Sequence, residues 1–229
     1  MKHAMSQPHR LKLISFELCP YVERSRIALV EKNLEHEVQF IDLRAKPDWF
    51  LAISPMGKVP VLQVDDQPIF ESLVINELIE ELFPSPPMLP VAPLARAEAR
   101  AWMVFAGDVL MPQSFKAQVA LAAGRPGDAA EPLASLRKAF ATLESQLGKR
   151  TGRFFSSDAF GLVDAVYAPF LRRWRIAEGW GEVKLLREFP AVAAYTEAVL
   201  SHPSVVQVTV PELDAKMRRL YAERASAKA

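Results

Sequence analysis

The chain has 229 residues, half of them hydrophobic and 24% charged, which is an ordinary globular composition for one large domain or two small ones. Its formal net charge of +1 gives no electrostatic reason to expect a nucleic acid or an anionic membrane as partner. No apolar run is long enough to span a bilayer, and residues 1–10 lack the apolar segment of a secretory signal. The single cysteine excludes an internal disulfide, and the four histidines lack metal-ligand spacing. We therefore expect a cytoplasmic protein with no metal site.

The only cysteine, Cys19, lies between a predicted strand and a predicted helix. Residues 11–16 alternate apolar and polar side chains, which is typical of a strand. Residues 21–33 are rich in helix formers with apolar positions at near-helical spacing. Pro20 suits the first position of that helix, where a missing N–H is no loss. This arrangement predicts that Cys19 lies at or next to the helix N-cap.

A thiol in that position is expected to be reactive. The unpaired N–H groups and the dipole of the helix N-terminus stabilise negative charge. Such a setting lowers a thiol pKa from about 8.5 into the range of roughly 3.5–7.5, which gives a thiolate at neutral pH. The alternative is that Cys19 serves only as a small buried hydrophobic residue.

The first third of the chain predicts a thioredoxin-like domain. Further strands are expected at residues 36–43, 59–64 and 68–70, with a short helix ending near 53 and a longer one capped by Ser72. The order is then β-α-β-α-β-β-α, and its first β-α-β unit implies a parallel pair of strands. We expect this domain to span residues 1–83, with residues 1–10 as a tail.

A proline-rich stretch, residues 84–93, predicts a linker, and the strand pattern largely disappears after it. Residues 94–229 predict an all-helical second domain. Its helical patterns cover residues 94–123, 130–147, 162–178, 191–201 and 212–225.

Four motifs resemble those of cytosolic glutathione transferases, most closely the cysteine-type omega class. They are CPYVERSR at residues 19–26, AKPDWF at 45–50, PMGKVPVL at 55–62, and the pair Glu71-Ser72. The resemblance implies the glutathione transferase fold, which is an α/β thioredoxin-like domain followed by an all-α domain. It also implies that glutathione is a co-substrate and that no cofactor is tightly bound.

The resemblance assigns glutathione-binding roles to four residues. Lys46 matches the lysine that reaches the glycine carboxylate, and the Val59 backbone would pair with the cysteinyl part like an added strand. Ser72 and the first-turn N–H groups would hold the γ-glutamyl carboxylate, with Glu71 beside the ammonium group. Taken without the resemblance, Lys46 has the alternative of a solvated loop charge, and a plain helix cap is the favoured interpretation of Glu71-Ser72. The Val59-Pro60 bond is either cis or an ordinary strand start.

In the predicted helical domain the resemblance is weaker. Asp164 matches a folding motif at the start of a helix, but Gly161 stands where the family has a serine or threonine cap. Arg173 and Tyr195 fall where the family lines its second-substrate pocket. Helical arginine and tyrosine residues also serve surface and packing roles.

The resemblance implies thiol transferase or reductase activity, such as dehydroascorbate reduction, on a small electrophilic or disulfide substrate. Cys19 would form a mixed disulfide with glutathione, and a second glutathione would resolve it because the chain has no other cysteine. The alternatives are glutathione conjugation or reductive dehalogenation of aromatic electrophiles, and a non-catalytic interaction protein with the same fold. The family also implies a homodimer with a role in detoxification.

Overall fold

The computed structural model describes residues 8–226 and divides into two compact units, one ending at Pro87 and the other beginning at Met88. Of the predicted tail, residues 1–7 lie outside the described residues. His9 and Arg10 are held to a turn of the first unit, since the Arg10 N–H donates to Asp65 Oδ1 at 2.8 Å and His9 Nδ1 lies 2.6 Å from Asp65 Oδ2.

The first unit is a mixed four-stranded sheet with three helices, and it confirms the predicted α/β thioredoxin-like fold. Its elements are β1 (Leu11–Ser15), α1 (Pro20–Glu31), β2 (Glu37–Phe40), α2 (Asp48–Ile53), β3 (Val61–Val64), β4 (Gln67–Phe70) and α3 (Ser72–Leu82). The strand order is β2-β1-β3-β4. The β1–β2 pair is parallel, as predicted from the short helix between them, and β3 is antiparallel to both of its neighbours.

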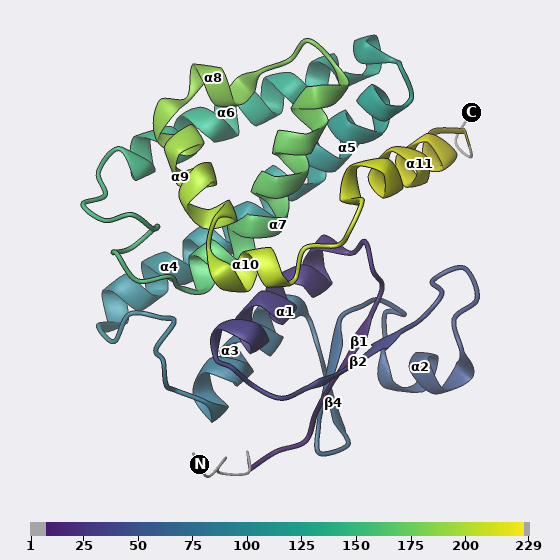
Figure 1. The fold of residues 1–229 in the computed structure, drawn as a ribbon, viewed down its shortest axis with the longest axis vertical. Helices are drawn as coiled ribbons and strands as arrows, with labels where there is room; N and C mark the ends of the chain where they lie inside the picture. The colour runs from purple at the N-terminus through teal and green to yellow at the C-terminus, as the bar shows by residue number, and fades with distance from the viewer. Residues whose placement is uncertain (1–7, 227–229) are drawn as a thin grey trace. The chain divides into compact units, whose positions relative to one another are not determined.

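Helices α1 and α3 pack against each other on one side of the sheet, and α2 lies on the other side (Figure 1). The helix α1 ends at Glu31, and Asn33 just beyond it adopts the left-handed conformation at φ 52°. A buried ion pair joins the two packed helices, with Lys32 Nζ 2.7 Å from Glu80 Oε2. Lys32 Nζ also donates to the carbonyl groups of Phe83 and Pro86, so this ammonium group is fully satisfied without water.

The second unit is all helical, as predicted. Its elements are α4 (Pro93–Phe105), η1 (Ala106–Leu110), α5 (Met111–Ala122), η2 (Pro126–Ala129), α6 (Ala130–Leu147), α7 (Leu162–Ala177), η3 (Glu178–Trp180), α8 (Leu185–Glu188), α9 (Pro190–Leu200), α10 (Pro203–Gln207) and α11 (Leu213–Ser226). Within residues 8–226, no helix has both the length and the apolar character needed to cross a membrane.

Helix α7 is the centre of the helical unit, with α5 and α9 packed against it (Figure 1). It is buried along most of its length, including Trp174, whose indole N–H donates to Glu178 Oε1 at 3.0 Å. The outermost helix, α11, packs on α5. One predicted helix over residues 94–123 is in fact α4 and α5 joined by the π-helical segment η1.

The N-terminus of α7 explains the glycine that replaces the expected serine or threonine cap. Gly161 is the N-cap residue, and its N–H donates to Asp164 Oδ2 at 2.9 Å. The next N–H, of Leu162, donates to the Met88 carbonyl at 2.8 Å, which brings that carbonyl against the cap. A Cβ atom at position 161 would lie 2.9 Å from the Met88 oxygen, too close for a side chain without backbone movement. Close backbone approach therefore requires glycine here.

Candidate functional site

Three chain segments that carry predicted site residues meet at one end of the strands of the sheet. The antiparallel register places Ile14, near the end of β1, opposite Val61, the first residue of β3. Val61 also lies opposite Phe70, the last residue of β4. Cys19 follows β1, Val59 precedes β3 and Glu71 follows β4. The strand register thus gathers these three residues at one end of the first unit.

Cys19 is the N-cap residue of α1, as predicted from Pro20. Its backbone is extended at φ −76° and ψ 116°, and its carbonyl accepts a hydrogen bond from the Glu23 N–H at 3.1 Å. The Cys19 N–H in turn donates to the Phe16 carbonyl at 3.0 Å, which fixes the turn between strand and helix. The side chain is partly exposed. The thiol therefore lies at the positive end of the helix dipole and is not fully buried.

The thiol also lies against the backbone before β3. Cys19 Sγ is 3.9 Å from the Val59 carbonyl oxygen, and the Val59-Pro60 bond is cis. Within residues 8–226 the Val59 N–H donates no hydrogen bond. Beside the thiol there is consequently a backbone segment with an available N–H group, which is one element that strand-like pairing with a peptide requires.

Lys46 is exposed and lies close to the turn that leads to Val59. Its Nζ would be 3.3 Å from a Cβ atom at Gly57, which adopts φ +57°. Ser54 holds this turn, because its hydroxyl donates to the Lys58 carbonyl at 2.8 Å and accepts from the Lys58 N–H at 2.9 Å. The Lys46 ammonium group is thus beside the segment that carries Val59.

The cap of α3 differs from the prediction. Ser72 is the first residue of the helix, and the N-cap residue is Glu71, which has φ 69° and ψ 111°. The prediction used the preference of serine for caps, but the chain changes direction one residue earlier through this unusual backbone conformation. Ser72 is buried, and its carbonyl accepts a 3.5 Å hydrogen bond from the Ser25 hydroxyl of α1. A residue other than glycine held at positive φ is a common feature of functional sites.

Arg24 is a charged residue near Cys19 that the sequence did not single out. It is 1% exposed, and its guanidinium lies 4.9 Å from the centre of the Tyr21 ring. Its Nε and Nη2 atoms have no hydrogen-bond partner among the described residues. Burial lowers the pKa of Arg24 to about 10, while the charges of Tyr21 and Cys19 act to raise that pKa. The attraction is mutual, so Arg24 favours the thiolate form of Cys19.

Arg173 and Tyr195 both lie in the interior of the helical unit. Arg173 is 2% exposed, and its Nη1 donates to the Pro169 carbonyl at 3.1 Å. The Tyr195 hydroxyl donates to Asp164 Oδ1 at 2.7 Å, and the ring lies under the guanidinium of Arg150. Burial raises the pKa of Tyr195 well above its usual value. Both side chains therefore support the packing around α7.

Comparison with known proteins matches both units of the chain. Residues 18–82 match the family model for the glutathione S-transferase N-terminal domain, and residues 128–198 match the model for the glutathione S-transferase C-terminal domain. A solved structure of rice GST1 in complex with glutathione has a TM-score of 0.85 and 28% identity, covering 96% of this chain and 98% of that chain.

Two relatives carry the comparison further. The chain is 32% identical over 194 residues to the probable glutathione S-transferase DHAR1, cytosolic, of Oryza sativa subsp. japonica, covering 82% of this chain and 83% of that protein. It is 29% identical over 197 residues to glutathione S-transferase omega-2 of Rattus norvegicus, covering 85% of this chain and 77% of that protein. These findings confirm the resemblance, and this chain belongs to the glutathione S-transferase family.

Proposed function

We propose that this protein is a glutathione-dependent thiol transferase or reductase that works through the thiolate of Cys19. The observation that carries the proposal is the position of the thiol, partly exposed at the N-cap of α1 and 3.9 Å from the Val59 carbonyl oxygen. The helix N-terminus and the buried Arg24 both favour the anion that such chemistry needs. Relatives named omega-2 and DHAR1 support the same class of activity.

Glutathione is proposed as a co-substrate that binds where the end of β1, the start of β3 and the end of β4 meet. Its cysteinyl part pairs with the Val59 backbone, whose N–H is available within the described residues. Its γ-glutamyl carboxylate meets the first-turn N–H groups of α3 and Ser72, and Glu71 pairs with the ammonium group. Lys46, exposed beside Gly57, reaches the glycine carboxylate. Rice GST1, a structural neighbour, was solved in complex with glutathione, and this supports glutathione as the ligand.

The proposed reaction has two exchange steps. The Cys19 thiolate attacks the glutathionyl sulfur of a mixed disulfide, forms a Cys19–glutathione disulfide and releases the substrate as a thiolate, which takes a proton. The thiolate of a second glutathione then attacks the glutathionyl sulfur on Cys19. This step regenerates the Cys19 thiolate and releases oxidised glutathione. An external thiol is required because Cys19 is the only cysteine in the chain.

For the second substrate we retain Arg173 and Tyr195 as candidate contacts. Each is buried and hydrogen-bonded within the helical unit, where it could serve packing alone. For Tyr195, the variant Tyr195→Phe should separate substrate contact from packing. A change in KM with unchanged stability would support substrate contact, and a loss of stability alone would remove Tyr195 from the site. We also propose a cytoplasmic homodimer on the basis of family membership, and a monomer in light scattering at micromolar concentration would contradict the dimer.

A reductase assay with matched variants tests the proposal. Wild-type protein should be retained on immobilised glutathione and should reduce a glutathionylated peptide and dehydroascorbate in the presence of glutathione. Cys19→Ser should still be retained but should lose both reductase activities, because serine cannot form the mixed disulfide. Full reductase activity in Cys19→Ser would overturn the mechanism. Conjugation of aromatic electrophiles by the wild type without reductase activity would favour the alternative, a conjugating transferase.

A further inference from the structure

The turn between α2 and β3 contains a glycine, Gly57, whose missing side chain leaves room for Lys46. Gly57 adopts φ +57°, and its N–H donates to the Ser54 carbonyl at 2.8 Å. A Cβ atom at this position would lie 3.3 Å from Lys46 Nζ and 3.4 Å from Leu51 Cδ2. The first distance is shorter than an ordinary van der Waals contact, and the second is at its lower limit. The ends of these two side chains therefore occupy the space that a larger residue at position 57 would need.

The Lys46 ammonium group is placed by this contact rather than by an ion pair. Lys46 is exposed, and its Cδ as well as its Nζ lies near the Cβ position of Gly57, at 3.8 Å, so the side chain is folded over the turn. Among residues 8–226 the ammonium group has no hydrogen-bond or ion-pair partner. A lysine ammonium is otherwise a point charge on a flexible stem. The space above Gly57 thus decides where this charge lies.

The backbone of the turn is braced, so an added side chain would displace Lys46 before it displaced the turn. Ser54 is buried, and its hydroxyl donates to the Lys58 carbonyl at 2.8 Å and accepts from the Lys58 N–H at 2.9 Å. The Gly57 N–H is bonded to the carbonyl of the same serine. Lys46 makes the closer contact with the Cβ position and is free to swing into solvent. We therefore expect any side chain at position 57 to move the ammonium group away from the turn.

We propose that Gly57 is a positioning residue that sets the preference of this protein for γ-glutamyl peptides ending in a free carboxylate. The inference rests on the proposed function, in which Lys46 reaches the glycine carboxylate of glutathione. Gly57 acts through Lys46 and has no side chain with which to touch the ligand. Its contribution is the space that keeps the ammonium group beside the segment that carries Val59. A peptide whose terminal carboxylate is replaced by an amide gains nothing from this placement.

The test compares the affinities of glutathione and of its C-terminal amide by calorimetry at low salt. The wild type should bind glutathione roughly two- to fivefold more tightly than the amide, as expected for one exposed ion pair. Lys46→Gln should bind both peptides equally. Gly57→Ala should reduce the preference by about half or more, while binding the amide within about twofold of the wild type. Gly57→Asn should remove the preference, because asparagine tolerates the left-handed conformation but has a larger side chain.

The matched controls are Gly124→Ala and Gly124→Asn. Gly124 has φ +66°, its N–H also donates to a carbonyl three residues earlier, that of Leu121 at 3.0 Å, and nothing lies within 4 Å of its added Cβ. Gly57→Ala and Gly124→Ala should both lower the melting temperature, by roughly 2–4 °C, because both place a Cβ atom on a left-handed backbone. Only the variants at position 57 should change the preference for the carboxylate. A merely structural role of Gly57 would leave that preference as it is in the wild type.

The pattern across the variants separates this inference from the proposed function. If Lys46→Gln loses the preference but Gly57→Ala or Gly57→Asn keeps it at the wild-type level, the role of Gly57 is overturned and the Lys46 assignment stands. If the wild type has no preference, or Lys46→Gln retains it, the Lys46 assignment is wrong and the role of Gly57 is overturned with it.

Discussion

Arg24 carries a charge that its buried position would otherwise disfavour. A buried guanidinium with two N–H-bearing atoms that lack protein partners costs free energy unless it interacts with a negative group. In the proposed function the thiolate of Cys19 is such a group, and the charge of Cys19 acts to raise the pKa of Arg24. The attraction between the two groups therefore offsets part of the free-energy cost of burying the Arg24 charge.

We expect Arg24→Gln to raise the alkylation pKa of Cys19 and to slow its alkylation by iodoacetamide several-fold below neutral pH. The control is Arg26→Gln, two residues further along α1, because only burial shifts the pKa of Arg26 and Cys19 does not contribute. Rates measured across a pH series would contradict the role of Arg24 if both variants matched the wild type. If Arg24→Gln proves unstable, Arg24→Lys keeps the charge and should retain most of the effect.

Gly161 offers a second test at the scale of one residue. The family pattern suggests that serine would cap α7 better, by a few tenths of a kcal/mol. The Met88 carbonyl, however, would be 2.9 Å from the new Cβ atom. Forcing that contact should cost about 1–3 kcal/mol, so Gly161→Ser should lower the free energy of unfolding. Gly127→Ser is the control, since nothing lies within 4 Å of its added Cβ. Urea unfolding that shows Gly161→Ser equal to or above the wild type would contradict the steric account.

At the scale of elements, the junction between β4 and α3 combines backbone strain with the proposed γ-glutamyl site. Glu71 has φ 69°, a conformation that glycine adopts without strain. Glu71→Gly should therefore leave stability unchanged or raised by up to roughly 1 kcal/mol. Loss of the charged contact should weaken glutathione binding by about ten- to a hundredfold.

Calorimetry with glutathione measures the change in affinity of Glu71→Gly, and urea unfolding measures the change in its stability. Ser72→Ala should also weaken binding, whereas Glu81→Gln, an exposed carboxylate near the other end of α3, should not. Unchanged affinity in both Glu71→Gly and Ser72→Ala would remove the γ-glutamyl assignment. If Glu71→Gly binds glutathione more weakly but is more stable than the wild type, the strained backbone at position 71 serves binding rather than folding.

The N-terminus of α7 has a pH dependence that follows from Asp164. Its Oδ1 accepts hydrogen bonds from the Phe155 N–H at 2.9 Å and the Tyr195 hydroxyl at 2.7 Å. Burial nevertheless raises the pKa of Asp164 from 3.8 to about 6. The folded state therefore binds this proton more tightly than the unfolded state does. The resulting stabilisation is complete below about pH 4 and is lost as pH rises through 6.

A shift of this size corresponds to roughly 3 kcal/mol between the two limits. The difference in unfolding free energy between the wild type and Asp164→Asn isolates it, since other carboxylates titrate equally in both proteins. As pH rises from about 4 to 7, the unfolding free energy of the wild type should fall relative to that of Asp164→Asn. A difference that stays constant over this range, or changes in the opposite direction, would contradict the protonated state of Asp164.

For the whole molecule, local patterns in the sequence predicted most of the elements. The predicted helix at residues 130–147 matches α6 (Ala130–Leu147), because its apolar period is regular and glycine follows it. Strand alternation predicted β1, and the short helix between β1 and β2 predicted their parallel pairing. These features depend on residues close in sequence, where propensity and periodicity act directly.

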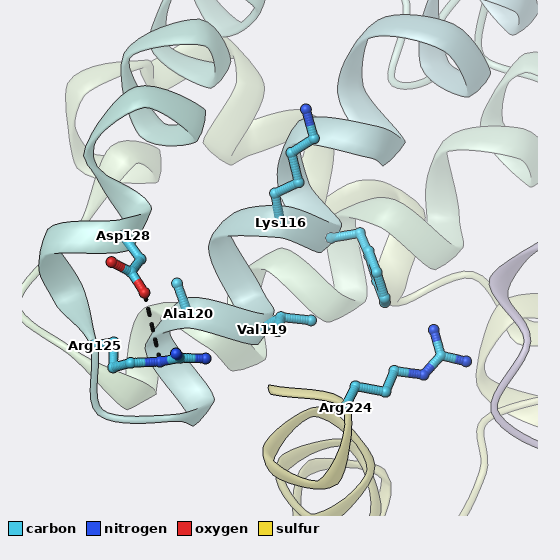
Figure 2. Close-up of a pocket in the computed structure, with 7 residues that line it drawn as sticks. Lys116, Val119, Ala120, Arg125, Asp128 and Arg224 are labelled. Carbon is cyan, nitrogen blue, oxygen red and sulfur yellow. Dashed lines mark ion pairs between the residues drawn. The ribbon is translucent and has the colours of Figure 1, made fainter. Parts of the chain in front are cut away.

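The features that the sequence did not reveal depend on packing between distant segments. The burial of Arg24 follows from the way α1 is covered, and an arginine inside an amphipathic helix resembles a surface charge in the sequence. The need for glycine at position 161 arises from the Met88 carbonyl, 73 positions earlier (161 − 88 = 73). A pocket of the helical unit is lined by residues of α5, η2 and α11 that share no local motif (Figure 2). Register did bring Cys19 and Val59 together, but only the full sheet topology made that visible.

The central claim, that Cys19 acts as a thiolate exchanging disulfides with glutathione, is tested most directly by intact-protein mass spectrometry. Wild-type protein mixed with oxidised glutathione at about pH 6 should gain one glutathionyl group faster than an unstructured cysteine peptide does, because the helix N-terminus and Arg24 favour the anion. Excess reduced glutathione should remove the group, and Cys19→Ser should gain none. The account is contradicted if the wild type gains no glutathionyl group, or gains it more slowly than the peptide.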